Sequence, residues 1–418
     1  MLTNIEPQAP DNHLANRYAA VRRTSEALVA PLEPEDTVVQ SMPDVSPAKW
    51  HLAHISWFFE EFVLSPFEPG YQRFNDRYDF IFNSYYYTVG QMYARPRRGL
   101  LTRPTLAEIL DYREHVDRAV IGLLDRQPGT TELAFRIELG LNHEQQHQEL
   151  LLTDIKHVLF QNPLKPAYDP ELPLPARATP SPLEFVPGPA GIVRAGFEGD
   201  GFFFDNETPR HETLLYPHRI ASRLVTNGEF REFIRDGGYE QCPLWLADGW
   251  GTVQSEGWHR PLYWSEDLDS EFTLGGEREI DADAPVAHLS YYEADAFARW
   301  AGARLPTEFE WEAAAADEPV EGNLFDAGYL HPVAGTGSQF FGDVWEWTSS
   351  SYAPYPGFEP LDGSLGEYNG KFMCNQMTVR GGSAVTSRDH IRPTYRSFFY
   401  PQQRWQMLGL RLAKDGDA

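Results

Sequence analysis

The sequence predicts two unlike parts: an N-terminal bundle of helices and then an irregular α+β domain. The first third of the chain contains long helix-favouring segments with few Pro or Gly residues. Residues 162–189 are about one-third proline, which indicates a semi-rigid linker. The remainder is rich in Gly, Trp and turn residues and has short strand-like runs. We therefore place a domain boundary in the proline-rich segment.

Four segments of the first part are expected to be helical. They cover residues 13–32, 48–64, 105–124 and 131–160. Ser46 and Pro47 supply an N-cap and first-turn pair for the second of them. A long aromatic loop, residues 68–99, joins the second helix to the third. Four helices with one elaborate connection suggest a bundle whose core can hold a metal between facing helices.

The second part has the pattern of an α+β domain with long functional loops. One helix is expected within residues 226–238. Another is expected within residues 290–316, where Thr307 and Glu310 form a capping box. We find no internal repeat.

Composition narrows the class of function. A net charge of −26 argues against a nucleic acid or an anionic membrane as partner. The two cysteines are too few for a disulfide framework or a cysteine-based zinc site. No signal-peptide pattern and no apolar run near the ~20 residues of a membrane span is present, so we expect a cytoplasmic protein.

Two histidines of the fourth helix, His143 and His147, are four residues apart. Such residues share one helix face, with Cβ atoms roughly 5–6 Å apart, so both imidazoles can bind one transition metal. They could instead lie on a solvated face. His143 shares a stripe with Leu139, Leu150 and Leu151, which favours an inward orientation. A buried imidazole needs a partner, and a metal is a suitable one.

The second helix offers a third ligand, either His51 or His54. His54 shares the stripe of Trp50, Trp57 and Phe58, the face that we expect to be buried. Spacing therefore slightly favours His54 without excluding His51, which we interpret as a core or surface residue.

The same segment also matches HExxH through His143, Glu144 and His147, the zinc-peptidase pattern in which Glu is the general base. A zinc hydrolase would need a further ligand from a nearby helix. The next acids, Asp169 and Glu171, lie in the proline-rich segment, which argues against this alternative.

Several motifs resemble one known family in the same order. They are KWHLAHISWFFE, NSYYYTVG, RPRRGLLTRP and NHEQQHQEL in the first part, and LVTNGEFREF, the segment from PVAHLSYYEADAF to WEAAA, GDVWEWT, VRGGS and GLRLAKD in the second. Together they resemble the ergothioneine-biosynthesis sulfoxide synthases (EgtB family). In this family a DinB-like four-helix bundle is fused to a formylglycine-generating-enzyme-like domain of the sulfatase-modifying-factor (C-type-lectin-like) type. The motifs extend from about residue 12 to 415, so with the proline-rich linker at 162–189 we expect domains at residues 12–161 and 190–415.

The resemblance also implies a mononuclear non-heme iron(II), held here by His54, His143 and His147. It implies O2-dependent C–S bond formation between a thiol and the imidazole of Nα-trimethylhistidine (hercynine). Three neutral imidazoles leave open positions on iron for substrates and O2. Glu144 then becomes an ordinary helix residue or a hydrogen-bond acceptor near the site.

Other roles follow from motif position. Tyr85 and Tyr86 correspond to tyrosines near the iron in members that use cysteine, where a phenol can donate a proton. We expect them to point to opposite sides of an extended loop, with Tyr86 the donor. Packing of a loop over the bundle is the alternative for both.

Four further residues are expected to bind substrate. Arg95 and Arg98 are candidates for the substrate carboxylates. Gln146 matches a position that hydrogen-bonds the substrate imidazole. Trp405 lies in the closing segment and could face the trimethylammonium group. Surface positions for the first three, and core packing for Trp405, would be the ordinary alternatives.

The chain departs from the family pattern at two places. Members that use γ-glutamylcysteine carry Asp and Arg after the late YR motif, whereas YRSFFYPQQRW has no acid, so we favour free cysteine as the donor. RGGSAVTSRDH lacks the paired cysteines of formylglycine-generating enzymes, so that copper chemistry is expected to be lost. An ovothiol-type or selenium-transferring relative, or a non-catalytic binding module, stays possible, since fold alone does not determine function.

Overall fold

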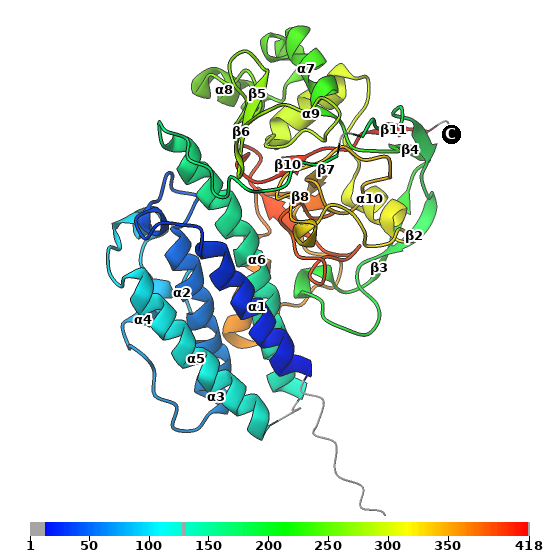
Figure 1. Ribbon diagram of the computed structural model, residues 1–418. Coiled ribbons are helices and arrows are strands. Elements are labelled where there is room, and N and C mark those ends of the chain that lie inside the picture. Colours follow the sequence, from blue (N-terminus) through cyan, green and yellow to red (C-terminus); the bar gives the residue numbers. More distant parts are fainter. Residues whose placement is uncertain (1–12, 128–130, 177, 417–418) are drawn as a thin grey trace, which may run out of the picture.

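The computed structural model describes residues 13–127, 131–176 and 178–416. A helical bundle is followed by a part built from small sheets, short helices and long loops, which confirms the predicted fold class (Figure 1). The helices of the first part are α1 (His13–Val29), α2 (Ala48–Phe59), α3 (Ser65–Phe67), α4 (Tyr78–Phe82), α5 (Leu106–Arg126) and α6 (Thr131–Gln161).

The long helices α1, α2, α5 and α6 correspond to the four predicted segments. Thr105 and Glu108 form a capping box at the start of α5. The predicted cap of α2 by Ser46 is wrong, because Pro47 occupies the N-cap position and no side chain caps the helix. The Ser46 backbone N–H instead donates to a carboxylate of α6, and its hydroxyl accepts from an arginine of the aromatic loop.

Helices α2 and α6 approach each other closely at Gly140. A Cβ atom at this position would lie 2.5 Å from the ring of Phe59. Only glycine therefore permits this contact without a shift of the aromatic ring. Gly140 lies about one turn before His143, so the close approach brings that turn of α6 against α2. Beyond Phe59, residues 60–64 continue the helix as a single π-helical turn.

The second part has helices α7 (Asn227–Arg235), α8 (Ala247–Glu256), α9 (Tyr291–Trp300) and α10 (Glu308–Ala315). The segment 290–316 thus holds two helices rather than one, and α8 was not predicted. The strands are β1 (Phe185–Pro187), β2 (Gly191–Ala195), β3 (His211–Leu215), β4 (His218–Ala221), β5 (Ser270–Thr273), β6 (Gly276–Glu279), β7 (Trp345–Ser351), β8 (Met377–Arg380), β9 (Ser397–Phe399), β10 (Leu408–Gly409) and β11 (Ala413–Asp415).

The largest sheet has the order β10-β7-β8-β9, and a second sheet has the order β1-β4-β11. β10 runs parallel to β7, whereas the other pairs in both sheets are antiparallel. The strands β2–β3 and β5–β6 form two separate hairpins. β1 lies inside the segment that we expected to be a linker, so the sheets of the second part begin before residue 190.

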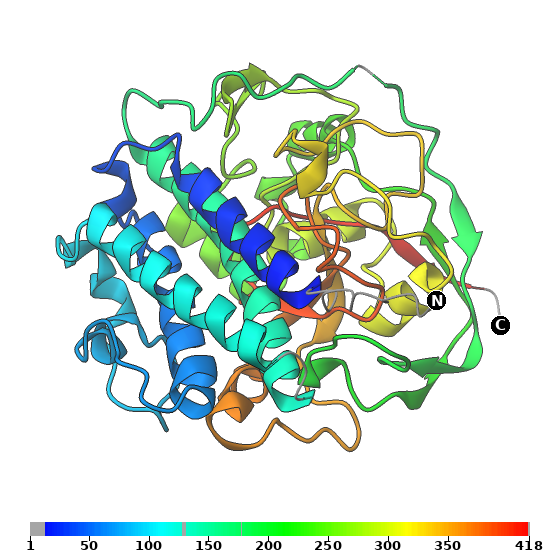
Figure 2. The same cartoon turned by 60° about the horizontal axis from the view of Figure 1, so that its bottom comes forward.

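Helix α6 lies between the other long helices and the second part (Figure 1). One continuous cluster of buried apolar residues extends through both parts. The orange segment near residues 363–372 reaches back beneath the bundle (Figure 2). There the Glu367 carboxylate accepts the backbone N–H groups of Tyr87 and Thr88. None of the described helices is long and apolar enough to span a membrane.

Candidate metal centre

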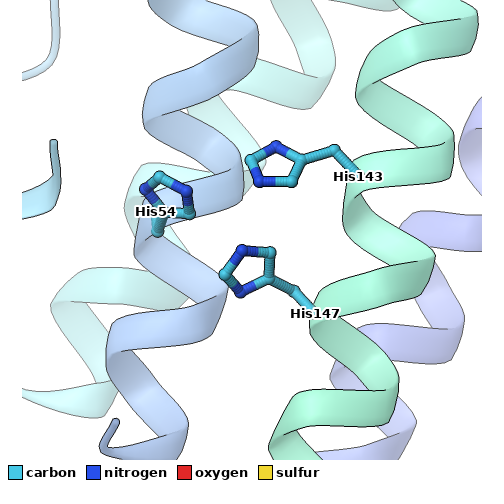
Figure 3. A group of neighbouring side chains, drawn as sticks. All are labelled: His54, His143 and His147. Atoms are coloured by element: carbon cyan, nitrogen blue, oxygen red, sulfur yellow. The ribbon is translucent and has the colours of Figure 1, made fainter. Parts of the chain in front are cut away.

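Three histidines converge in the core of the bundle. His54 extends from α2, and His143 and His147 extend from α6 toward it (Figure 3). Their ligand nitrogens all lie within 4.8 Å of one another. These are the three histidines that the stripe pattern favoured. His51 lies beside the group and contacts His147 instead of joining it.

Burial keeps these imidazoles neutral. It lowers the pKa of His143 to about 3. Burial, and next the neighbouring His143, also lower the pKa values of His54 and His147 well below the usual range. Low dielectric disfavours the charged imidazolium, and further positive charge nearby disfavours it again. Each ring therefore retains a lone pair for a metal at neutral pH.

The rings have unused ligand atoms. Nδ1 of His54 lies 2.6 Å from the carbonyl oxygen of Phe82, while its buried Nε2 has no hydrogen-bond partner among the described residues. A neutral imidazole that donates from Nδ1 keeps its lone pair on Nε2. A buried polar atom without a partner costs free energy, which a metal ion would offset. Three neutral imidazoles with ligand nitrogens this close together fit a transition metal that keeps open positions.

Glu144 is turned away from this group and is fully engaged. Its buried carboxylate accepts hydrogen bonds from Ser25 at 2.6 Å, Arg113 at 2.9 Å and Arg22 at 3.1 Å. Burial raises the pKa of this carboxyl group, but the two guanidinium groups outweigh burial and lower it overall. Glu144 is thus a structural anion between three helices, which leaves the HExxH hydrolase without its general base.

Tyr85 and Tyr86 lie on the same side of their loop, so the expectation of opposite sides is wrong. Their ring centroids are 4.6 Å apart. The loop is not extended here, because Asn83 closes a turn through hydrogen bonds with the backbone N–H and carbonyl of Tyr86. Tyr86 is fully buried, and its hydroxyl makes no hydrogen bond of normal geometry with the described residues. Burial raises the pKa values of both phenols, which stay protonated.

A third tyrosine, Tyr368, escaped the sequence analysis. Its ring centroid is 5.1 Å from that of His143, and its hydroxyl donates to the side-chain carbonyl of Gln146. The Gln146 amide donates in turn to the Tyr395 hydroxyl at 2.6 Å. Tyr368 lies in an irregular loop without periodicity, so no local pattern predicts its position near α6.

The two candidate arginines differ sharply in environment. Arg95 is exposed and donates to the backbone carbonyl of Asp44. Arg98 is only 2% exposed, stacks 3.4 Å above the Trp50 ring and donates to hydroxyl groups of two serines. Burial strongly lowers the pKa of Arg98. Among the described residues no carboxylate forms an ion pair with it, and attraction to Asp154 only partly offsets the effect of burial on its pKa.

Trp405 reaches the bundle from the second part. Its indole N–H donates to the Asp154 carboxylate of α6 at 2.9 Å, and the side chain is buried. Another carboxylate of α6, Glu149, accepts hydrogen bonds from Trp345, from Ser383 at 3.2 Å and from Thr386 at 2.7 Å. The second part thus binds α6 along the helix that carries two of the three histidines.

Comparison with known proteins agrees with this architecture. Residues 17–151 match the DinB superfamily, and residues 173–336 and 337–416 match the sulfatase-modifying factor enzyme 1-like domain. The chain is 28% identical to a formylglycine-generating enzyme of Streptomyces coelicolor, over 58% of this chain and 97% of that protein.

Two relatives match along almost the whole length. A hercynine oxygenase of Mycolicibacterium smegmatis is 32% identical, and one of Mycobacterium tuberculosis is 30% identical. Each alignment covers 96% of this chain and 98% of the relative. The chain therefore belongs to the hercynine oxygenase family of oxidoreductases, in which a DinB-type bundle is joined to a sulfatase-modifying-factor-type domain.

Proposed function

We propose that this protein joins the sulfur of cysteine to the imidazole of hercynine, using O2 and an iron(II) held by His54, His143 and His147. The product is hercynylcysteine sulfoxide, a step of ergothioneine biosynthesis. The thiol loses its S–H hydrogen and the imidazole its C–H hydrogen. One oxygen atom of O2 ends on sulfur, and the other leaves as water. The convergence of three neutral imidazoles in a chain of this family is the observation that carries the proposal.

Iron would supply a site for binding the thiol and activating O2. Everything else required of the protein is binding, orientation and proton supply. The lowered pKa values of the histidines support metal binding without competition from protons at neutral pH.

Arg98 is proposed to bind a substrate carboxylate. A guanidinium group buried without an anionic partner is unfavourable. A carboxylate bound beside Trp50 would remove that penalty and add charge-assisted hydrogen bonds. Arg95, which is exposed on the same loop, is proposed as a weaker contact at the entrance.

Gln146 and Trp405 are proposed to orient hercynine. Gln146 is tied to Tyr368 and Tyr395 and lies one residue before His147, so its amide is held beside the metal centre. The indole N–H of Trp405 is already bound to Asp154, which leaves only the ring face for the trimethylammonium group.

Tyr86 is proposed to hold the proton used during O2 chemistry, with the tilted ring of Tyr85 beside it. The Tyr86 phenol keeps its proton because burial raises its pKa, and the neighbouring Tyr85 raises it further. A positioned donor of this kind can direct a reaction toward one of two products.

Cysteine is the proposed sulfur donor because the segment from Tyr395 to Trp405 has no unpaired arginine that could bind a second carboxylate. The buried Arg396 is paired with Glu308, and Arg404 is paired with Glu293. A γ-glutamyl group converts the cysteine ammonium into an amide and adds its own ammonium and a second carboxylate, for which this segment has neither a free acid nor a free arginine.

The site is proposed to require both the bundle and the second domain, whose sheets begin with β1 before residue 190. Contacts of Tyr368 and Trp405 with α6 support this proposal. Neither domain should be active by itself. Full turnover by a chain that ends near residue 161 would contradict a shared site.

Anaerobic reconstitution with iron(II), followed by product analysis, tests the function. Hercynine and O2 are supplied with cysteine, γ-glutamylcysteine or selenocysteine, and histidine replaces hercynine in a parallel reaction. Mass spectrometry should find the sulfoxide chiefly from hercynine and cysteine. No hercynine-dependent O2 consumption with any donor would contradict the proposal, and a preference for histidine would indicate an ovothiol-type reaction.

A further inference from the structure

His51 lies next to the proposed metal centre but is not one of its ligands. Its Nδ1 is 2.8 Å from Nδ1 of His147, and its Nε2 is 3.1 Å from a carboxylate oxygen of Asp154. The side chain is 3% exposed. Both ring nitrogens are therefore used, one toward a proposed ligand and one toward a buried anion.

Metal binding would determine the direction of each of these hydrogen bonds. His147 uses Nδ1 for His51, so only Nε2 is available for a metal, and the proton of the neutral ring must lie on Nδ1. That N–H then donates to Nδ1 of His51, which must be unprotonated. The proton of His51 is therefore on Nε2 and donates to Asp154. The Asp154 carboxylate, His51 and His147 thus form one row of hydrogen bonds, in which each proton has a single consistent position.

Asp154 is firmly held at the end of this row. One carboxylate oxygen accepts the Ser46 backbone N–H at 2.8 Å as well as His51. The other oxygen accepts the Trp405 indole N–H at 2.9 Å. Three donors thus orient the carboxylate, two from the N-terminal end of α2 and one from the second domain. Trp405 connects the row to the second domain.

The other two histidines are supported differently. His54 has a peptide carbonyl, that of Phe82, as its partner. Nδ1 of His143 is buried and has no hydrogen-bond partner among the described residues. Among the described residues, only His147 of the three is linked to a carboxylate, through His51. A hydrogen bond from the far nitrogen of a ligating histidine fixes the tautomer and the ring orientation, and it makes the ring a stronger donor to the metal.

We propose that His51 is a positioning residue, which, held by Asp154, fixes the tautomer and orientation of His147 for metal binding. This inference rests on the proposed metal centre. It adds that a residue outside the ligand set controls metal affinity, and that Trp405 transmits the position of the second domain to that ligand.

Cobalt(II) binding to the full-length protein tests the inference without turnover. Affinity is measured by competition with a chelator, and the visible absorption of bound cobalt reports ligand geometry. His51→Phe should weaken binding by roughly 10- to 100-fold and alter the spectrum. His51→Asn, whose amide can occupy the place of Nδ1, should recover part of the affinity. Asp154→Asn should reduce the affinity for cobalt less than His51→Phe does.

His157→Phe is the matched control. His157 lies on α6, the helix of His143 and His147, is buried and hydrogen-bonds Ser41, but contacts none of the three histidines. It should leave affinity and spectrum unchanged. In the zinc-loaded protein, ¹⁵N spectra of labelled histidine should show His147 protonated on Nδ1, with that N–H protected from exchange. The protection should be lost in His51→Phe and kept in His157→Phe.

His143→Ala separates failure of the inference from failure of the metal centre. If wild type binds no cobalt, or His143→Ala binds cobalt as tightly as wild type, both the proposed metal centre and the proposed role of His51 are wrong. If His143→Ala loses binding while His51→Phe and His51→Asn keep wild-type affinity and spectrum, the centre stands and the role of His51 is overturned. Should His51→Phe not fold, unchanged affinity in both His51→Asn and Asp154→Asn overturns it equally.

Discussion

The helical and the loop-built halves of the site are held in different ways. In the helical half, His54, His143 and His147 project from α2 and α6, whose spacing is set by close contact at Gly140. In the other half, Arg98 and Tyr368 project from loops that belong to different domains. The comparison suggests that metal retention depends on the helices and substrate selection on the loops. The two functions should therefore be separable by mutation.

The largest effect is expected in the helical half. His54→Ala, His143→Ala or His147→Ala removes one of three ligands and should abolish iron loading, measured as iron per chain after anaerobic reconstitution and desalting. Tyr368→Phe, a substitution in a loop beside His143, should bind as much iron as wild type. Iron retention in His54→Ala together with its loss in His51→Ala would mean that the wrong histidine of α2 had been assigned.

The loops of the second domain carry a separate, structural charge at Asp343. Burial raises its pKa to about 6, although three donors hydrogen-bond the carboxylate. A carboxyl group whose pKa is higher in the folded state binds more protons when folded, so its contribution to stability falls as pH rises from about 4 to about 6. The total change is roughly 3 kcal/mol.

Asp343→Asn should remove this dependence and leave metal loading intact. Asparagine also suits the left-handed backbone conformation at this position, where φ is +57°. The measurement is the free energy of unfolding of both proteins between pH 4 and pH 6. Parallel pH profiles of wild type and Asp343→Asn would show that the carboxyl group titrates normally.

Arg98→Met should affect substrate binding alone. It removes a buried cation while keeping similar bulk over Trp50, so stability should be preserved. Loss of a charge-assisted contact should raise KM for one substrate by roughly 10- to 100-fold. The exposed Arg95→Met is the matched control and should change KM much less. Equal effects of the two substitutions would argue against a special role for the buried arginine.

The smallest effect is expected for Tyr86→Phe, which retains the ring and removes only the hydroxyl. Folding and metal loading should be unaffected, since the ring that fills the core is kept. Sulfoxide formation should slow, and a larger share of cysteine should be oxidised to its sulfinic acid. Product ratios are compared for Tyr86→Phe, Tyr85→Phe and the double substitution. Unchanged ratios in all three would indicate that water supplies the proton.

The sequence was informative where a regular period relates residues. The 3.6-residue period placed His143 and His147 on one face and favoured His54 over His51. The same reasoning failed in the loop, where Tyr85 and Tyr86 were assigned to opposite sides. The period of a strand does not apply there, because Asn83 forms a turn with Tyr86.

Contacts across the domain interface could not be derived from any local pattern. Tyr368 and Trp405 lie more than 200 residues from their partners on α6, at sequence separations of 222 and 251. Such pairings depend on how the domains pack. The role of His51 was likewise hidden, because a histidine on the neighbouring stripe gives no sign that it contacts a second histidine and an aspartate.

Diffraction at the iron absorption edge from crystals reconstituted anaerobically with iron(II) is the most direct test of the metal centre. We predict one strong anomalous peak per chain. It should mark an iron ion bound by Nε2 of His54, by Nε2 of His147 and by His143, with His51 hydrogen-bonded to His147 and not in contact with the metal. A peak at another position, or one in which His51 replaces His54, would contradict the proposed centre.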